Sequence, residues 1–201
     1  MFHLREDRRH ITDRDVEDFR QHLDTKLDFE LSLAPEIVSI CCRNAPQLAT
    51  LVPERREEVT TEGGLDVASQ MKRVRSVVRK LFDAGVREVA VFVDPEPDQV
   101  DAASEVGANA IELHTGDYAL AGSRIKRLKV LQRLDAAARR ANENGLIVHA
   151  GHGLDYDNIE LFCKTVPIVE EVSIGFAIIS RSLFVGIDRA VSDMLRLVQS
   201  S

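Results

Sequence analysis

Short apolar stretches alternate along this chain with longer stretches whose apolar residues recur every three or four positions. The short stretches indicate buried strands and the longer ones indicate amphipathic helices. One such helix carries Val67, Val74, Val78 and Leu81 on one face and stops at Gly85. The seven predicted strands are Phe2–Arg5, Leu27–Ser32, Gln47–Val52, Glu88–Val93, Ala110–His114, Leu146–Ala150 and Glu171–Ile174.

A predicted helix follows every strand, and capping residues or prolines mark where several of these helices begin. The remaining helices follow Thr12, span Pro35–Arg43 and Asp98–Val106, run from Ser123 to Gly145, and span Asp157–Lys164 and Ser182–Val198. The chain contains no linker and no low-complexity tract between these units. We therefore expect a single domain over residues 1–201, built from seven βα units.

Strict alternation of strands and helices predicts a parallel α/β sheet covered by helices. Two architectures fit this pattern, an open doubly wound sheet and a closed TIM-type (β/α)8 barrel. A barrel needs eight units and typically about 250 residues, so seven units in 201 residues are one unit short. Because an open sheet tolerates seven strands, the count of units does not separate the two architectures.

The placement of polar residues favours the barrel. Ionisable or small polar residues follow nearly every predicted strand: Arg5, His10, Glu30, Thr60, Glu112, His114, His152 and Gly175. In a barrel, the carboxyl ends of all strands converge on one active site. In an open sheet, only the residues near the switch point would meet. We therefore expect a (β/α) barrel in which the first βα unit is missing.

Glu30 lies on a strand whose two faces differ. Leu27, Phe29 and Leu31 alternate with polar residues, whereas a strand of a parallel sheet is normally apolar on both faces. A carboxylate on the inward face would have a raised pKa and would suit general acid or base chemistry. The alternative is a structural carboxylate held in a salt bridge.

Two glycine-rich turns, Ala150–Gly153 and Ile174–Ala177, follow the last two predicted strands. In a barrel these turns would follow strands 7 and 8, where phosphate is usually bound. Glycine lets backbone N–H groups approach an anion closely, and the N-terminus of a helix adds its dipole. The two turns together therefore predict a phosphate site.

Two further clusters have less specific patterns. A run of cations next to Glu6 and Asp7 resembles an anion clamp, but it can equally be a solvated loop that neutralises itself; the cations are Arg5, Arg8, Arg9 and His10. His149 and His152 have the spacing of a metal-binding pair. Because no third ligand has a convincing spacing, we expect no metal site.

The composition of the chain argues against some classes of binding partner. The net charge is −7 and no long block of Lys or Arg offsets it, so neither a nucleic acid nor an anionic membrane is expected to bind. The charged N-terminus has no signal-peptide pattern, and no stretch reaches the length of a membrane span. Cys41, Cys42 and Cys163 form no disulfide framework and are expected to be small core residues of a cytoplasmic protein.

Five segments of the chain resemble the pyridoxine 5′-phosphate synthase family, and the resemblance covers essentially the whole chain. The segments are His-Leu-Arg-Glu-Asp-Arg-Arg-His-Ile at 3–11, Leu-Val-Pro-Glu at 51–54, Glu-Val-Thr-Thr-Glu-Gly-Gly-Leu-Asp-Val at 58–67, Ile-Glu-Leu-His-Thr-Gly at 111–116 and Ala-Gly-His-Gly-Leu at 150–154. The resemblance implies a TIM barrel that joins 1-deoxy-D-xylulose 5-phosphate to 3-amino-2-oxopropyl phosphate and releases phosphate and water. It also implies that no metal or organic cofactor takes part, and that the protein forms a ring-like homo-oligomer, often an octamer.

The resemblance also implies roles for individual residues. His3 and Glu30 match the proton acceptors, His152 matches the proton donor, and Glu112 matches the carboxylate that stabilises the transition state. The positions that match contacts to the deoxyxylulose phosphate are Arg5, His10 and Thr60. The positions that match contacts to the aminoketone phosphate are Gly153, Gly175 and Phe176.

The chain departs from the family pattern in two respects. Phe176 stands where the family is expected to have a histidine, so one phosphate donor is absent. The first strand and helix of the family, with an Asn, an Asp-His pair and an Arg that contact the substrates, would lie before His3. An alternative to an active enzyme is therefore a non-catalytic remnant or an assembly subunit of the same family.

Overall fold

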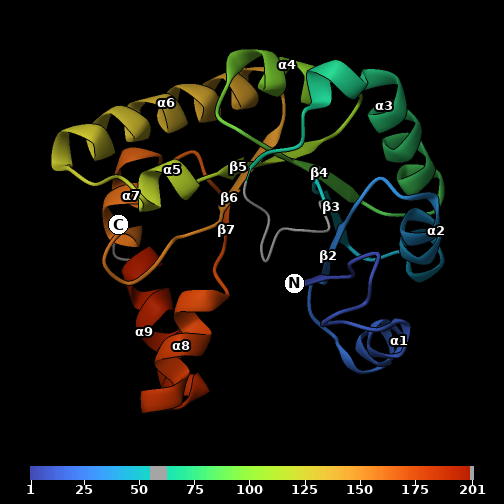
Figure 1. The fold of residues 1–201 in the computed structure, drawn as a ribbon, viewed down its shortest axis with the longest axis horizontal. Helices are drawn as coiled ribbons and strands as arrows, with labels where there is room; N and C mark the ends of the chain where they lie inside the picture. Colours follow the sequence, from blue (N-terminus) through green and yellow to red (C-terminus); the bar gives the residue numbers. More distant parts are fainter. Residues whose placement is uncertain (55–62, 200–201) are drawn as a thin grey trace.

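The structure is a computed structural model that describes residues 1–54 and 63–199. Within these residues, parallel strands form one sheet that curls into an open barrel, with helices along its outside (Figure 1). The strands are β1 (Phe2–His3), β2 (Asp28–Leu31), β3 (Leu48–Leu51), β4 (Glu88–Val93), β5 (Ala110–His114), β6 (Ile147–Gly151) and β7 (Glu171–Ser173). The helices are α1 (Asp13–His22), α2 (Pro35–Asn44), α3 (Val67–Asp83), α4 (Pro97–Glu105), α5 (Gly116–Ala119), α6 (Arg124–Glu143), α7 (Ile159–Thr165), α8 (Phe176–Val185) and α9 (Ile187–Gln199).

The order of the strands separates the two predicted architectures. Each strand pairs in parallel with the next one along the chain, from β1 to β7. A doubly wound sheet reverses its strand order at a switch point, and the described sheet contains no such reversal. The sheet is therefore of the barrel type, as predicted, and β1 and β7 form the two edges of its described part (Figure 1).

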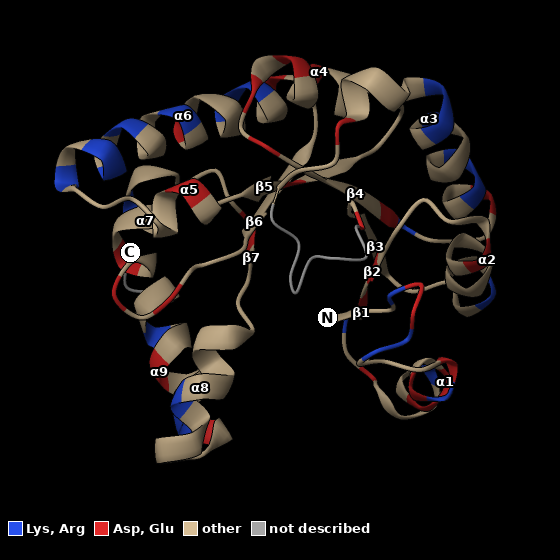
Figure 2. Cartoon of the chain, in the orientation of Figure 1, with Lys and Arg blue, Asp and Glu red and all other residues tan. Residues whose placement is uncertain are grey.

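An apolar layer between the sheet and the helices holds the barrel together. Val89, Val91 and Val93 of β4 are fully buried, as expected for a parallel sheet with both faces covered. Val74 and Leu81 of α3 are also fully buried, on the helix face that the sequence predicts. Lys and Arg are concentrated on the outer helices, most visibly on α3 and α6 (Figure 2). Buried polar side chains nevertheless lie on several strands, among them Asp28, Glu112 and His149.

The C-terminal helical region differs from the prediction. The single helix predicted over Ser182–Val198 is in fact two helices, α8 and α9, which are separated by Gly186. Gly186 has a φ of +81°, a left-handed conformation that ends a helix and that glycine adopts at little cost. α8 begins directly after Gly175 without a side-chain cap, so no capping residue marks its start in the sequence.

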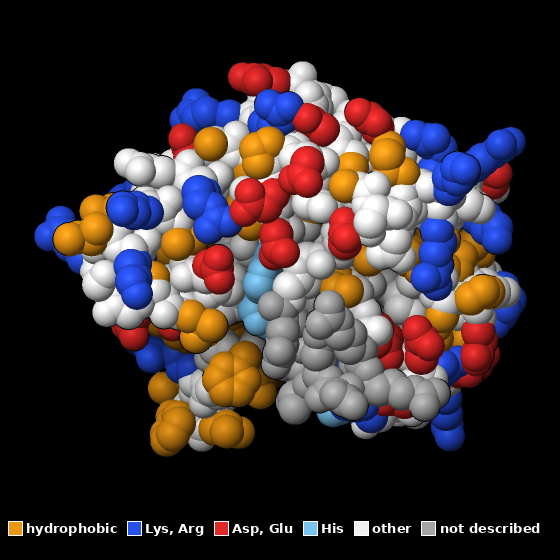
Figure 3. Space-filling view, turned by 45° about the horizontal axis from the view of Figure 1, so that its top comes forward, with side chains coloured by type: hydrophobic (Ala, Val, Ile, Leu, Met, Phe, Trp, Pro, Cys, Tyr) orange, Lys and Arg blue, Asp and Glu red, His pale blue; other side chains and the backbone are white. Residues whose placement is uncertain are grey.

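Helix α8 exposes several large apolar side chains. Phe176, Leu183 and Phe184 are 89%, 81% and 89% exposed. Figure 3 shows apolar side chains gathered at the lower left of the molecule, in the region of α8. The helix thus presents an apolar face next to the carboxyl end of β7.

All three cysteines are free thiols; Cys41 is fully buried in the core, and burial raises the pKa of its thiol. Cys42 and Cys163 are partly buried against the same core. None of the described helices is long and apolar enough to cross a membrane.

Candidate active site

One cavity of about 670 Å³ lies among the residues that end or follow the strands. It is lined by nine of the ten residues that the sequence predicts for the site: His3, Arg5, His10, Glu30, Glu112, His152, Gly153, Gly175 and Phe176. The tenth, Thr60, lies outside the described residues. The barrel thus brings together side chains that are up to 173 positions apart in the sequence, from His3 to Phe176.

His3 of β1 and Glu30 of β2 lie side by side, because the parallel register pairs these two positions. Burial and the nearby charge of Asp28 raise the pKa of Glu30 to about 7. Burial and the positive charge of Arg5 lower the pKa of His3 to about 4. Near neutral pH, His3 is therefore a neutral imidazole and Glu30 is in mid-titration, so both groups can accept a proton.

Glu112 extends from β5 into the interior of the barrel and is only 3% exposed. A Cβ atom on Gly151 of the neighbouring β6 would lie 1.9 Å from Glu112 Oε1, so the carboxylate occupies space that only a glycine leaves open. Burial raises the pKa of Glu112 well above its ordinary value, and the charges of Glu30 and Asp28 raise it further. Burial also raises the pKa of Asp28, to about 6. Three carboxyl groups in one interior repel one another, so the site retains protons near neutral pH.

His152 follows β6 in a strained backbone conformation that the neighbouring loop holds in place. Its φ is +78°, a region that costs a residue other than glycine about 1–3 kcal/mol. The hydroxyl of Thr115 lies 2.6 Å from the carbonyl oxygen of His152 and 2.7 Å from that of Gly151. The N–H of Thr115 also donates to the Gly151 carbonyl, at 2.9 Å. Because such strain persists only where the surroundings enforce it, this turn is a strong candidate for a functional position.

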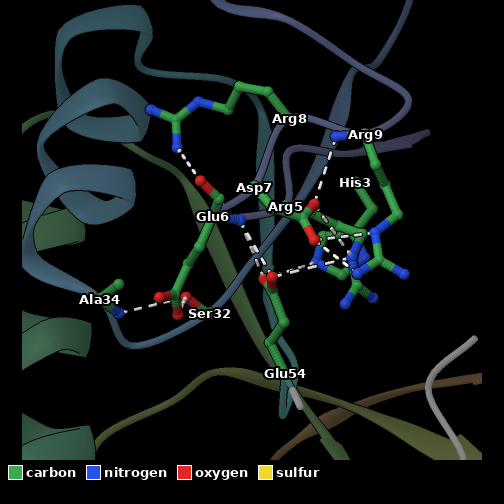
Figure 4. Close-up of polar contacts among 9 residues, drawn as sticks. All are labelled: His3, Arg5, Glu6, Asp7, Arg8, Arg9, Ser32, Ala34 and Glu54. Atoms are coloured by element: carbon green, nitrogen blue, oxygen red, sulfur yellow. Dashed lines mark hydrogen bonds and ion pairs between the residues drawn. The ribbon is translucent and has the colours of Figure 1, made fainter. Parts of the chain in front are cut away.

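Two cations of the loop after β1 are neutralised by carboxylates of the loop and its neighbours. Figure 4 shows the pairing of Arg9 with Asp7. Arg8 pairs with Asp13 at 3.0 Å and with Glu36 at 2.5 Å. Arg9 pairs with Asp7 at 2.5 Å. Arg8 and Arg9 therefore fit the second of the two interpretations, a loop that neutralises its own charge, whereas Arg5 and His10 line the cavity.

Arg5 is 4% exposed and is held by a residue that the sequence patterns did not single out (Figure 4). Glu54 follows β3, and its carboxylate lies 3.7 Å from Arg5 Nε and 3.6 Å from His3 Nε2. The same carboxylate accepts a hydrogen bond from the backbone N–H of Glu6, at 3.0 Å. Glu54 therefore ties the loop after β1 to the end of β3. Asp7 also lies 3.7 Å from Arg5 Nε, so two carboxylates flank the buried guanidinium group. Its place two residues after the predicted strand Gln47–Val52, within the segment 51–54 that resembles the family, was the signal that could have identified it.

The other edge of the cavity is formed by the turns after β6 and β7. Gly153 has a φ of +80°, and a Cβ atom there would lie 2.6 Å from the Cβ of Ala119, so this turn requires glycine. Gly175 is the N-cap of α8, and Phe176 and Ala177 begin the helix at the cavity wall. The first turn of a helix carries unpaired N–H groups and the positive end of the dipole, which attract anions. Because the side chain of Phe176 has no polar atom, only backbone groups can bind an anion at this position.

His149 does not join His152 in a metal site. His149 Nε2 lies 3.0 Å from Glu88 Oε1, at the start of β4, and Glu88 also pairs with Lys26 at 3.1 Å. His152, by contrast, lies in the turn after β6 and lines the cavity. Within residues 1–54 and 63–199, no group of three or more His, Cys, Asp and Glu side chains could hold a metal ion.

Comparisons with known proteins match this chain over essentially its whole length. Residues 1–200 match the family described as "Pyridoxal phosphate biosynthesis protein PdxJ". A pyridoxine 5′-phosphate synthase of Salinibacter ruber is 58% identical over all of this chain, which covers 83% of that relative. A second one, of a Synechococcus species, is 51% identical over 96% of this chain and 80% of the relative.

Solved structures share the fold at much lower sequence identity. One, described as "Native KDPGal structure", has a TM-score of 0.56 and 15% identity, and the match covers 93% of this chain and 76% of that one. A xylose isomerase domain protein of Planctomyces limnophilus has a TM-score of 0.51 and 14% identity, over 86% of this chain and 71% of that one. These two likenesses concern the fold alone. The family match and the two close relatives together show that the chain belongs to the family of the pyridoxal phosphate biosynthesis protein PdxJ.

Proposed function

We propose that this protein is a pyridoxine 5′-phosphate synthase, which joins 1-deoxy-D-xylulose 5-phosphate to 3-amino-2-oxopropyl phosphate and releases phosphate and water. The observation that carries the proposal is the cavity itself, whose lining includes three imidazole and three acidic side chains together with Arg5 and two glycine turns. This arrangement suits acid–base chemistry on a small molecule with a phosphate at either end. The alternative of a non-catalytic assembly subunit has no observation in its favour.

The two edges of the cavity are suited to two phosphates. Arg5 and His10 supply cationic or hydrogen-bonding groups at the β1 edge, and we assign them to the deoxyxylulose phosphate. The backbone N–H groups around Gly153, Gly175 and Phe176 form the other edge, and we assign them to the aminoketone phosphate. Thr60, which lies outside the described residues, stays a predicted contact to the deoxyxylulose phosphate. Binding through remote phosphates fixes the reacting carbons between the ionisable groups.

His3 and Glu30 are suited to removing protons from the substrates. Imine formation, loss of water and ring closure each require proton transfers, so more than one acid or base must face the bound pair. The pKa of Glu30, about 7, lets it take up a proton and pass it on near neutral pH. The pKa of His3, about 4, keeps this imidazole unprotonated at the same pH. We assign the opposite role, proton donation to a leaving oxygen, to His152 from across the cavity.

Glu112 is suited to stabilising positive charge in the middle of the reaction. Its carboxyl group holds a proton readily, because burial and two neighbouring acids raise its pKa. A protonated imine formed between the amine and the ketone would bring a cation into this interior. The carboxylate would then be ionised and paired, so the interaction strengthens as the charge develops.

Protein side chains supply each proposed acid and base, so the reaction as proposed needs no metal or organic cofactor. We also propose that the protein is a cytoplasmic homo-oligomer, in the manner of the octamers that the family resemblance implies. The exposed apolar side chains of α8 support burial of this face against further polypeptide. Light scattering on the purified protein measures the number of subunits directly.

Complementation tests the proposed function in cells. A bacterial strain that cannot make vitamin B6 because it lacks this synthase would carry either the gene for this protein or its Glu30→Gln variant. We expect the parent gene to restore growth without added pyridoxine and the variant gene to fail, although both proteins accumulate equally. Growth with neither gene, at equal protein levels, would contradict the proposal.

A further inference from the structure

An ion pair between two neighbouring strand ends lies beside the cavity. Asp94 directly follows β4 and His114 ends β5, and Asp94 Oδ1 lies 2.9 Å from His114 Nδ1. The same Asp94 oxygen accepts a hydrogen bond from the backbone N–H of Gly64, at 3.1 Å. The His114 side chain is only 10% exposed. Neither Asp94 nor His114 is among the residues that line the cavity.

The His114 ring touches the ring of His152, which does line the cavity. The two ring centroids are 5.0 Å apart, at an interplanar angle of 58°. The His114 ring also packs against the ring of Phe92. The two ring centroids are 5.2 Å apart, in an edge-on arrangement. A Cβ atom on Gly116 would lie 2.5 Å from His114 Nε2 and 3.3 Å from His152 Cδ2. The two imidazoles are therefore packed against each other and against the backbone at Gly116, where even a methyl group would not fit.

Asp94 determines how the His114 ring is presented. The hydrogen bond to His114 lowers the pKa of Asp94, so this group is a carboxylate that accepts the Nδ1–H of the ring. With Nδ1 fixed by the carboxylate, the plane and the tautomer of His114 are fixed as well. A rigid His114 in turn restricts the rotation of the His152 ring, because the two rings are in contact.

We infer that Asp94 and His114 are positioning residues for His152, so that a carboxylate, an imidazole and a second imidazole on three successive strand ends orient the proton donor. This inference rests on the proposed function only in calling His152 a donor. In metal sites, partners that orient a ligating histidine typically contribute about 10–100-fold, and we expect an effect at the lower end of that range here. Neither Asp94 nor His114 needs to touch a substrate for this role.

The test compares Asp94→Asn, His114→Phe and Asp94→Glu with the parent enzyme. Asp94→Asn keeps the shape but removes the charge, and His114→Phe keeps a ring while removing the hydrogen bond. Asp94→Glu retains a carboxylate and should restore part of the effect. The matched control is Asp83→Asn, which removes an exposed carboxylate of an ion pair on α3. Each protein is assayed for kcat and KM, and the His114 Nδ1–H proton and the His152 ring are examined by NMR and crystallography.

We expect kcat of Asp94→Asn and His114→Phe to fall about tenfold, with KM within about twofold of the parent. In Asp94→Asn the His114 Nδ1–H resonance should move upfield, and the His152 ring should adopt more than one orientation. A purely structural role would instead lower stability and leave the His152 ring in place, which would overturn the inference. So would an unchanged kcat with an unchanged ring. If the parent enzyme has no synthase activity, the proposed function fails, but the His152 orientation in the variants still decides the inference.

Discussion

His3 and Glu30 occupy paired positions in the parallel register of β1 and β2, yet their pKa values are shifted in opposite directions. The pKa of the imidazole is lowered to about 4, and that of the carboxyl group is raised to about 7. Burial is the main cause of both shifts, because it disfavours whichever form of a group carries charge. One buried environment therefore leaves the imidazole unprotonated and brings the carboxyl group close to mid-titration near neutral pH.

The pH dependence of activity should follow the ionisation of Glu30. A general base works only when it is unprotonated, and Glu30 is protonated below about pH 7. We expect kcat/KM to fall about tenfold for each pH unit below that value, while His3, with a pKa of about 4, remains unprotonated. A pH–rate profile from about pH 5.5 to 8.5 measures this. A flat acid limb over that range would mean that Glu30 is not the base.

Glu30 should also lower the stability of the folded protein above neutral pH. Its folded pKa of about 7 exceeds the ordinary value of 4.5, so the unfolded chain loses this proton first as pH rises. The unfolding free energy therefore falls between about pH 4.5 and 7 and stays lower at higher pH. Glu30→Gln should be more stable than the parent by about 1–3 kcal/mol at pH 8, or about 2–12 °C in Tm, and nearly equal to it near pH 4.5. Thermal unfolding at the two pH values measures the difference; a variant less stable than the parent at pH 8 would contradict the sign.

Gly151→Ala should displace Glu112 while preserving the fold. The added Cβ would lie 1.9 Å from Glu112 Oε1, so the carboxylate must move out of its place in the interior. We expect kcat to fall at least about tenfold, because the group that stabilises charge no longer faces the substrate. Gly122→Ala is the control, since nothing lies within 4 Å of the Cβ added there. Steady-state kinetics and circular dichroism on both variants separate loss of function from unfolding. Equal kcat values in the two variants would refute the assignment of Glu112.

Arg5 and His152 should affect different kinetic constants. Arg5→Ala removes a charge from a phosphate that is present throughout the reaction, so KM for the deoxyxylulose phosphate should rise about tenfold or more. His152→Ala and Glu112→Gln remove groups that act on charge developing during the reaction, so these variants should lose mainly kcat. Arg79→Ala, on the exposed face of α3, controls for the loss of an arginine. The reverse pattern in full kinetic curves would show that these roles are wrongly assigned.

The barrel and most of its site could be predicted because their signals are local. Strand ends and alternating faces marked Glu30 and Glu112, and the parallel sheet brought these residues together. The break at Gly186 was missed because apolar residues continue across it, so periodicity alone predicted one helix. Glu54 was missed because its role depends on Arg5 and His3, which are distant in sequence and meet it only in the fold. For the same reason, the sequence could not decide which cations of the loop after β1 are neutralised there.

The most direct test of the central claim is formation of the product by the purified protein. The protein is mixed with 1-deoxy-D-xylulose 5-phosphate and 3-amino-2-oxopropyl phosphate without added metal or cofactor, and pyridoxine 5′-phosphate is measured by mass spectrometry together with released phosphate. Glu30→Gln and the surface variant Glu143→Gln are measured in parallel. We predict that the parent and Glu143→Gln form pyridoxine 5′-phosphate at similar rates, and that Glu30→Gln is slower by about 10²–10⁴-fold. A parent protein that forms no pyridoxine 5′-phosphate, or a Glu30→Gln variant within about threefold of it, would contradict the account.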